Sequence, residues 1–153
     1  MSYDLLLFTH IASVILLLGV GAGSAFYKFM ADRSGNLEVI VHTNKMVVLA
    51  DWLFITPSAI LQPLTGVLLM NMLNISIWTP WLLASIILYI FAGVLWLVAV
   101  YLQIRMKDMA LEVQRKEETL GKEYFLFVKY WVILGIFSFL AMASVFVLMV
   151  FKP

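Results

Sequence analysis

Few polar side chains interrupt the apolar stretches of this chain, and His10 has the most specific chemistry among them. A neutral imidazole can ligate haem iron through one nitrogen while a hydroxyl or carbonyl group holds the other. At the depth of His10, Met70 and Met142 are candidate second ligands, and Gly21 leaves room for a flat macrocycle. With Ser13 they form a candidate b-type haem site. Alternatively, the histidine is a hydrogen-bonded packing residue and the methionines fill the core.

The first apolar stretch, residues 5–29, carries five polar or small residues on one face. Spacings of 3, 8, 3 and 4 residues place them within about 80° of one another on an α-helix. Because polar groups are costly in lipid, the face is expected to point toward the protein interior. The stripe consists of His10, Ser13, Gly21, Ser24 and Lys28.

The opposite face of the same stretch carries the small residues Ala12, Gly19 and Gly23. The spacing of Gly19 and Gly23 lets a second helix approach closely. The helix therefore has two contact faces, which places it at the centre of the bundle or in a homodimer interface through Gly19 and Gly23.

The second apolar stretch carries a polar stripe of its own, which we expect to face the first. Pro57 and Pro63 interrupt the helix, and each removes a hydrogen bond and can kink it. Thr56, Ser58 and Gln62 could satisfy the freed carbonyl groups, so repair of the breaks is one explanation of the stripe. The stripe consists of Asp51, Ser58, Gln62 and Thr65.

Asp51 lies about one helical turn inside the end of its apolar stretch, at a depth similar to that of Lys28 and Arg105. One interpretation is a structural ion pair, and the other is a carboxylate that binds a proton or a ligand. The second interpretation gives a candidate polar pocket. Its residues are Lys28, Asp51, Ser58, Gln62, Thr65 and Arg105.

The elements that position these residues are membrane helices. The chain is 64% hydrophobic and only 12% charged, whereas soluble domains are about half apolar and about a quarter charged. Four stretches are long enough to cross the roughly 30 Å hydrocarbon core, and lipid requires them to be helical. We therefore predict an all-α four-helix bundle in the lipid bilayer, a single transmembrane domain over residues 1–153. Its spans are residues 5–29, 46–73, 80–103 and 130–150.

The basic residues predict the orientation of the bundle. Nine of the ten flank the first and third connections, and only Lys152 lies on the other side. The positive-inside rule places the nine in the cytoplasm and both termini on the periplasmic side of a bacterial inner membrane. The polar stretch after residue 103 predicts that the third helix extends into the cytoplasm and ends near Gly121. An aromatic belt is expected from Tyr3, Trp78, Trp81, Tyr101, Tyr124 and Tyr130.

Several strings of residues resemble a bacterial family of predicted integral membrane proteins, domain of unknown function 2269. The resemblance covers essentially the whole chain and supports the four-helix fold, but it implies no established activity. The strings are GVGAGSAFY (19–27), LADWLF (49–54), TP (56–57), QPLTG (62–66), QIRM (103–106) and MVFKP (149–153).

A looser resemblance involves one histidine and one glycine. His10 early in the first helix, with Gly21 about one leaflet later, is similar to the arrangement in four-helix membrane proteins of the HemJ and CopD types. HemJ-type proteins are haem-associated oxidoreductases, and CopD-type proteins are linked to copper handling. The resemblance implies that His10 ligates haem, although no second matching ligand is present.

Two functions from different classes follow. The first is a b-type haem protein that works in electron transfer or as a small oxidoreductase. The second is a module without a cofactor, which either binds or transports a small molecule or serves as an accessory subunit. Its site would lie at the second helix, where the prolines interrupt it. A net charge of +1 gives no case for nucleic acid as a partner, and the absence of cysteine excludes thiolate chemistry.

Overall fold

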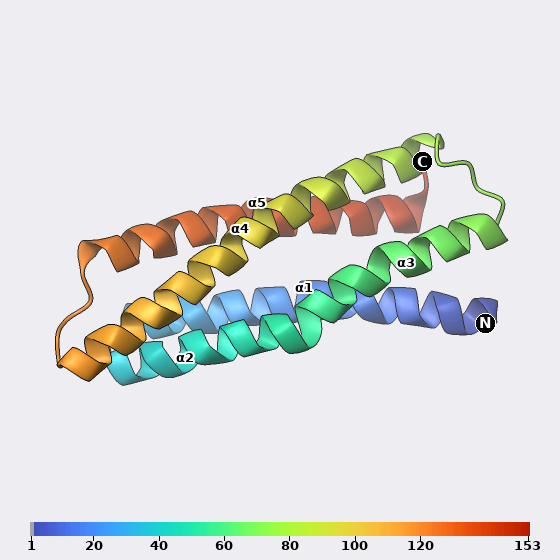
Figure 1. The fold of residues 1–153 in the computed structure, drawn as a ribbon. Coiled ribbons are helices and arrows are strands. Elements are labelled where there is room, and N and C mark those ends of the chain that lie inside the picture. Colours follow the sequence, from blue (N-terminus) through green and yellow to red (C-terminus); the bar gives the residue numbers. More distant parts are fainter. Residues whose placement is uncertain (1) are drawn as a thin grey trace.

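The computed structural model describes residues 2–153 and consists almost entirely of helices (Figure 1). No strand occurs among the described residues, so the predicted all-α fold is confirmed. In chain order the elements are α1 (Tyr3–Ser34), α2 (Leu37–Ala50), the π-helical segment η1 (Asp51–Ile55), α3 (Thr56–Met72), α4 (Pro80–Lys116) and α5 (Lys122–Phe151).

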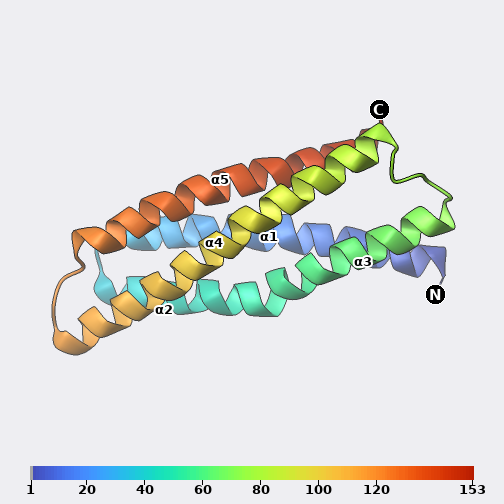
Figure 2. The same cartoon turned by 45° about the horizontal axis from the view of Figure 1, so that its top comes forward.

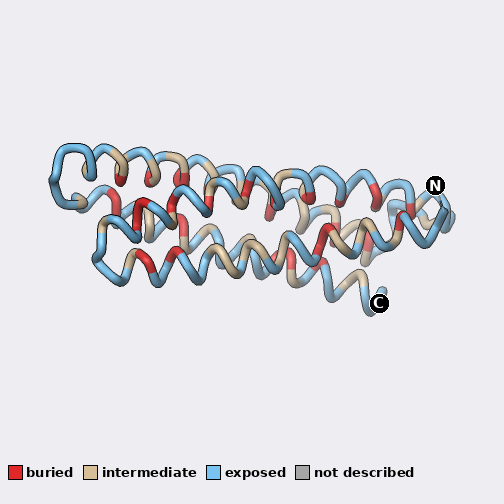
Figure 3. Tube along the Cα trace, turned by 90° about the horizontal axis from the view of Figure 1, so that it is seen from below, coloured by how far each residue is buried: buried red, intermediate tan, exposed pale blue. Residues whose placement is uncertain are grey.

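Four helical stretches are long and apolar enough to cross a membrane, as predicted. They are α1, the continuous run Leu37–Met72, α4 and α5. Figure 3 shows buried positions on the inner faces of the helices and exposed positions around the outside. Many of the exposed residues are large and apolar, which suits a surface that lipid rather than water surrounds.

The helices form two pairs. α4 packs along α5, and α1 packs along α2 and α3, while α2 also contacts α4 (Figures 1 and 2). Both termini and the α3–α4 connection lie at one end of the bundle, here called the termini end (Figure 1). The α1–α2 turn and the α4–α5 loop form the other end, called the basic end because the predicted basic connections lie there.

The helices run beyond the predicted membrane-crossing stretches. α1 continues to Ser34, and Gly35 then adopts a left-handed conformation with φ of 66°. Asn36 caps α2 by accepting hydrogen bonds from the backbone of Glu38 and Val39, so this helix begins at Leu37 rather than near residue 46. A hydropathy pattern marks the part of a helix that crosses the hydrocarbon, whereas the caps mark its ends.

The extension of α4 beyond residue 103 is confirmed, but its end differs from the prediction. The helix ends at Lys116, where the Lys116 ammonium lies 2.6 Å from Glu112 one turn earlier. Glu117 then adopts the left-handed conformation expected of a helix end. Gly121, predicted as the end of this helix, instead precedes the first residue of α5, Lys122.

The second span is interrupted once, at η1. The backbone N–H of Thr56 donates to the carbonyl of Asp51, five residues earlier, instead of to the usual partner four residues earlier. Pro57 follows directly, and in regular α geometry its ring would clash with the Leu53 carbonyl. The chain changes direction where α2 passes into α3 (Figure 1). Pro63 lies inside α3 without ending it, so only one of the two expected breaks interrupts the helix.

The core is unevenly distributed along the bundle. Toward the basic end, α2, α4 and α5 enclose a large buried cluster that includes Ile40, Met106 and Trp131. A second cluster, Ala92, Ala141 and Met142, is much smaller. The middle of the bundle between α1, α4 and α5 therefore contains few large buried side chains.

Candidate functional site

His10 connects α1 to α3 through both of its ring nitrogens. Its Nδ1 lies 2.8 Å from Thr65 Oγ1, and its Nε2 lies 3.2 Å from Gln62 Nε2. Thr65 donates its own hydroxyl hydrogen to the Leu61 carbonyl at 2.6 Å, so this network assigns the proton to His10 Nδ1. Nε2 then accepts from the Gln62 amide. His10 is thus a neutral imidazole with a partner at each nitrogen.

The stripes of α1 and α3 therefore meet, as expected, and we call this contact the polar seam: His10, Ser13, Ser58, Gln62 and Thr65. Two of its members, Ser13 and Ser58, are buried, and the Ser13 hydroxyl donates to the Thr9 carbonyl. Gln62 Oε1 is buried without a partner in the described part of the chain. The histidine ring lies over Gly66, where an added Cβ would come within 3.4 Å of Cε1.

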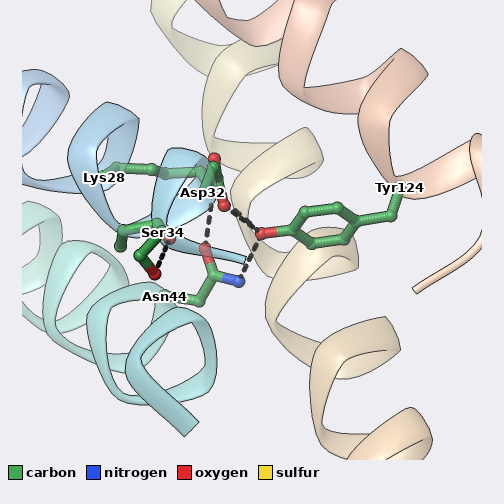
Figure 4. A network of polar contacts seen from close by, with 6 residues as sticks. Lys28, Asp32, Ser34, Asn44 and Tyr124 are labelled. Carbon is green, nitrogen blue, oxygen red and sulfur yellow. Dashed lines mark hydrogen bonds and ion pairs between the residues drawn. The ribbon is translucent and has the colours of Figure 1, made fainter. Parts of the chain in front are cut away.

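Lys28 lies at the centre of a buried polar network near the basic end (Figure 4). Its ammonium donates to Asp32 Oδ2 at 2.9 Å, Asn44 Oδ1 at 2.7 Å and Tyr124 Oη at 3.2 Å. A lysine ammonium has three N–H groups, so all of its donors are used. The three partners come from α1, α2 and α5, and Lys28 therefore ties three helices together.

The acceptors of this network are also bonded to one another. Tyr124 donates its hydroxyl hydrogen to Asp32 Oδ1 at 2.6 Å and accepts a hydrogen bond from Asn44 Nδ2 at 3.0 Å. Tyr124 is completely buried, so its predicted place in an interfacial aromatic belt is wrong. The Lys28 ammonium also lies over the rings of Tyr124 and Trp131, at 5.3 and 5.7 Å from their centroids.

Asp51, the first residue of η1, is hydrogen-bonded to Gln103 of α4, which is in turn bonded to Trp131 of α5. With the Gln103 amide oriented to satisfy its neighbours, Nε2 donates to Asp51 Oδ2 at 2.6 Å and Oε1 accepts from Trp131 Nε1 at 3.0 Å. The ion pair considered for Asp51 is not formed by any of residues 2–153. Lys28 is held by Asp32 instead, and Arg105 is exposed.

The predicted polar pocket is therefore three separate sites. Ser58, Gln62 and Thr65 belong to the polar seam, Lys28 belongs to the network near the basic end, and Asp51 lies apart from both. Only Asp51 of these residues opens onto the large cavity of the bundle.

That cavity lies between α1, η1, α4 and α5 and has a volume of about 460 Å³. Its wall is overwhelmingly apolar, and small residues contribute to it from three helices: Gly21, Ala22, Ala92, Gly93 and Gly135. The carboxylate, amide and indole groups of Asp51, Gln103, Trp96 and Trp131 also line it. The cavity is open to the outside of the bundle, where the exposed residues Phe29, Ile136 and Leu140 line it. It is an apolar site with one carboxyl group in its wall.

The residues of the predicted haem site do not gather around this cavity. Gly21 and Met142 line it, whereas His10, Ser13 and Met70 are not part of its wall. Both nitrogens of His10 already have partners, so iron ligation would require the bond from Gln62 or the bond to Thr65 to be broken. No group of three or more histidine or carboxylate side chains within the described ranges could hold a metal ion. The side chains present thus do not fit haem at His10.

Several of the interacting residues were not identified from the sequence. Asn44 precedes Asp51 by seven residues and continues the polar stripe of the second span, but the predicted start near residue 46 left it outside. Asp32 follows Lys28 by four residues, a spacing that predicts an ion pair on a helix. Gln103, Trp96 and Trp131 have no such signal, because only the packing of α4 and α5 brings them to Asp51.

The predicted homodimer face makes no close helix contact within residues 2–153. An added Cβ at Gly19 or Gly23 would meet no atom within 4 Å in the described structure, so neither glycine serves a close helix contact within it. The homodimer stays a prediction, and an unchanged oligomeric state of Gly19→Leu in detergent would contradict it.

Comparison with known proteins gives a family and no activity. No curated protein and no solved structure matches the chain. None of the comparisons shows the looser resemblance to HemJ-type or CopD-type proteins. One family model matches residues 4–153, nearly the whole chain, under the description "Predicted integral membrane protein (DUF2269)". The match agrees with the four helices that are long and apolar enough to cross a membrane, and the chain belongs to this family of integral membrane proteins.

Proposed function

We propose that this protein is a membrane-embedded binding module for an apolar small molecule, with the cavity between α1, η1, α4 and α5 as its site. The cavity itself is the observation that carries the proposal. Its volume of about 460 Å³ falls within the range of roughly 300–1,000 Å³ typical of ligand pockets. Its apolar wall with a few polar groups is also typical of such sites.

The glycines of the wall support a binding role over a packing defect. Gly21, Gly93 and Gly135 line the cavity, and an added Cβ at any of them would meet no atom within 4 Å among the described residues. They are therefore not there to let helices approach closely. Their effect is to leave space, which lipid-dissolved helices would otherwise fill by packing.

The π-helical turn also supports this location. π-helical turns occur frequently at functional sites, and η1 contributes Asp51 and Ile55 to the cavity wall. The site thus includes the proline-broken second span, as the alternative of a small-molecule binding or transport module expected.

A cavity-filling substitution tests the proposal. Gly93→Leu should reduce binding of a neutral lipophilic probe, triphenylphosphine oxide, by about tenfold, because the new side chain occupies its space. Equilibrium dialysis of the full chain in detergent measures the binding. Ile133→Phe on the exposed face of α5 is the matched control and should leave binding unchanged. Equal binding by the wild type and Gly93→Leu would contradict the proposal.

Haem binding through His10, with electron transfer or oxidoreductase activity, stays a prediction that the hydrogen bonds of His10 do not favour. An absorption spectrum of the protein, purified from cells supplied with iron, tests it, and the absence of a Soret band would contradict it. The role of accessory subunit also stays a prediction, without an observation of its own.

We further propose that the protein lies in a bacterial inner membrane with its basic end in the cytoplasm. The proposal is supported by the nine basic residues that flank the α1–α2 and α4–α5 connections.

A further inference from the structure

Asp51 is the most unusual group in the cavity wall, because it is a buried carboxyl group without a cation beside it. It is 4% exposed, and no ion pair reaches it from any of residues 2–153. An ionised carboxylate in such surroundings is unstable unless a proton or a cation neutralises it. The question is which partner the cavity can supply.

The protein's own cations are committed elsewhere. The Lys28 ammonium uses its three N–H groups on Asp32, Asn44 and Tyr124. Arg105 is exposed on the outside of α4. Neither side chain lines the cavity. A neutralising cation other than a proton would therefore come with the ligand.

The hydroxyl groups of the cavity wall are satisfied by the protein. Tyr89 donates its hydroxyl hydrogen to the Ala59 carbonyl at 2.6 Å, and the Ser138 hydroxyl donates to the Ala92 carbonyl. Ser24 bonds to the Val20 carbonyl. These donors face the backbone, so they offer nothing to an anionic or hydrogen-bond-accepting ligand.

Asp51 itself keeps acceptor capacity for a ligand. Two carboxylate oxygens offer about four acceptor positions, and Gln103 fills one of them. Trp96 Nε1 lies near the carboxylate but completes no hydrogen bond to it or to any other described residue. The cavity thus offers the unused acceptor positions of Asp51 and one unpaired donor, the Trp96 indole N–H.

Aromatic rings extend the same preference along the cavity. Phe29, Tyr89, Trp96 and Phe139 line it together with the apolar helix faces. The faces of such rings attract cations, most strongly where water is excluded. An apolar cavity with several aromatic rings and a single carboxylate that has no cation beside it is complementary to a hydrophobic molecule that carries one positive charge.

We propose that the ligand of this cavity is a lipophilic organic cation, whose charge Asp51 neutralises. The inference rests on the proposed binding function and adds the charge of the ligand. It excludes lipophilic anions, because no basic side chain lines the cavity and the carboxylate repels them.

The test uses three aromatic probes of similar size and different charge. They are tetraphenylphosphonium, tetraphenylborate and neutral triphenylphosphine oxide, each measured by equilibrium dialysis against the full chain in detergent. Partition into micelles is removed by subtracting the binding that remains in Gly93→Leu. We expect the cation tetraphenylphosphonium to bind the cavity most tightly and the neutral triphenylphosphine oxide more weakly. The anion tetraphenylborate should show no cavity-specific binding.

Asp51→Asn identifies the group responsible. The amide keeps the shape and can still accept from Gln103, so tetraphenylphosphonium should bind about tenfold more weakly while triphenylphosphine oxide changes less than about twofold. Asp108→Asn, at an exposed carboxylate on α4, is the matched control and should change neither.

The outcomes separate the inference from the proposed function. If Gly93→Leu weakens binding but Asp51→Asn leaves the cation unaffected, the cavity binds ligands and the charge assignment is wrong. If Gly93→Leu affects no probe, both are wrong. Should Asp51→Asn fail to fold, the wild type alone decides, because equal cavity-specific binding of tetraphenylphosphonium and tetraphenylborate would overturn the inference.

Discussion

Lys28 shows how a single residue can keep a positive charge inside this bundle. Each of its three N–H groups has an acceptor, and one of these, Asp32, carries the balancing negative charge at 2.9 Å. Networks of this kind are stable only when every member is satisfied, because an unpaired buried group loses the full free energy of its lost hydration. Tyr124 is the member that all the others contact.

Removal of the Tyr124 hydroxyl should therefore destabilise the fold. Tyr124→Phe leaves Lys28, Asn44 and Asp32 each without one partner, so the free energy of unfolding should fall by about 1–3 kcal/mol. Unfolding in mixed detergent micelles with increasing dodecyl sulfate measures the loss. Tyr130→Phe is the matched control, since that tyrosine is exposed and should tolerate the change. An equal, small effect of both variants would mean that the network adds little stability.

At the scale of the elements, the second span contains two prolines, but its α-helical winding is interrupted only next to Pro57. Pro63 has no N–H to donate to the Ala59 carbonyl four residues earlier, and its ring crowds that carbonyl. The hydroxyl of Tyr89 on α4 donates to this oxygen at 2.6 Å. A neighbouring helix therefore satisfies the group that the proline leaves free, which allows α3 to continue.

This compensation predicts a non-additive pair of substitutions. Tyr89→Phe alone should cost about 1 kcal/mol of unfolding free energy, because Ala59 loses its donor. In a Pro63→Ala background the same change should cost less, because residue 63 then donates an N–H to that carbonyl. A double-mutant cycle in detergent measures the coupling, with Tyr101→Phe as the exposed control. Additive effects would show that the two groups act independently.

The sequence predicts the spans of this fold better than it predicts their ends or their side-chain partners. Apolar length identifies the four spans, and the periodic spacing of His10, Gln62 and Thr65 places them on facing stripes. The pairing of Asp51 with Gln103 depends on how α4 packs, and local spacing carries no signal for that. The π-turn was not predicted either, because proline indicates a disturbed helix without specifying how the backbone adapts.

At the scale of the whole molecule, the two ends of the bundle differ in charge. The ends of the helices and the connections at the basic end carry nine of the ten basic residues, while the α3–α4 connection has no charged residue. This asymmetry is the basis of the proposed orientation.

Labelling of single cysteines tests that orientation, because the natural chain contains no cysteine. Ser76→Cys in the α3–α4 connection should react with a membrane-impermeant maleimide in intact spheroplasts. Thr119→Cys in the α4–α5 loop should react only after the membrane is permeabilised, and both positions are exposed in the fold. The reverse pattern would place the basic end outside. Labelling of both variants after permeabilisation is the control for reactivity.

The π-turn at η1 has a consequence for the phase of the second span. Each α-helical residue rotates the chain by about 100°, and a π-turn holds roughly one residue more than an α-turn. If residues 51–55 were wound as ordinary α-helix, everything after Ile55 would rotate by about 100° relative to α2. Asn44 and Gln62 lie 18 residues apart, which is five full turns of a regular α-helix, so regular winding would put them on one face. With the π-turn the two directions differ by about 100°, and the two halves of the span meet α1 with different faces, Asn44 at Lys28 and Gln62 and Thr65 at His10.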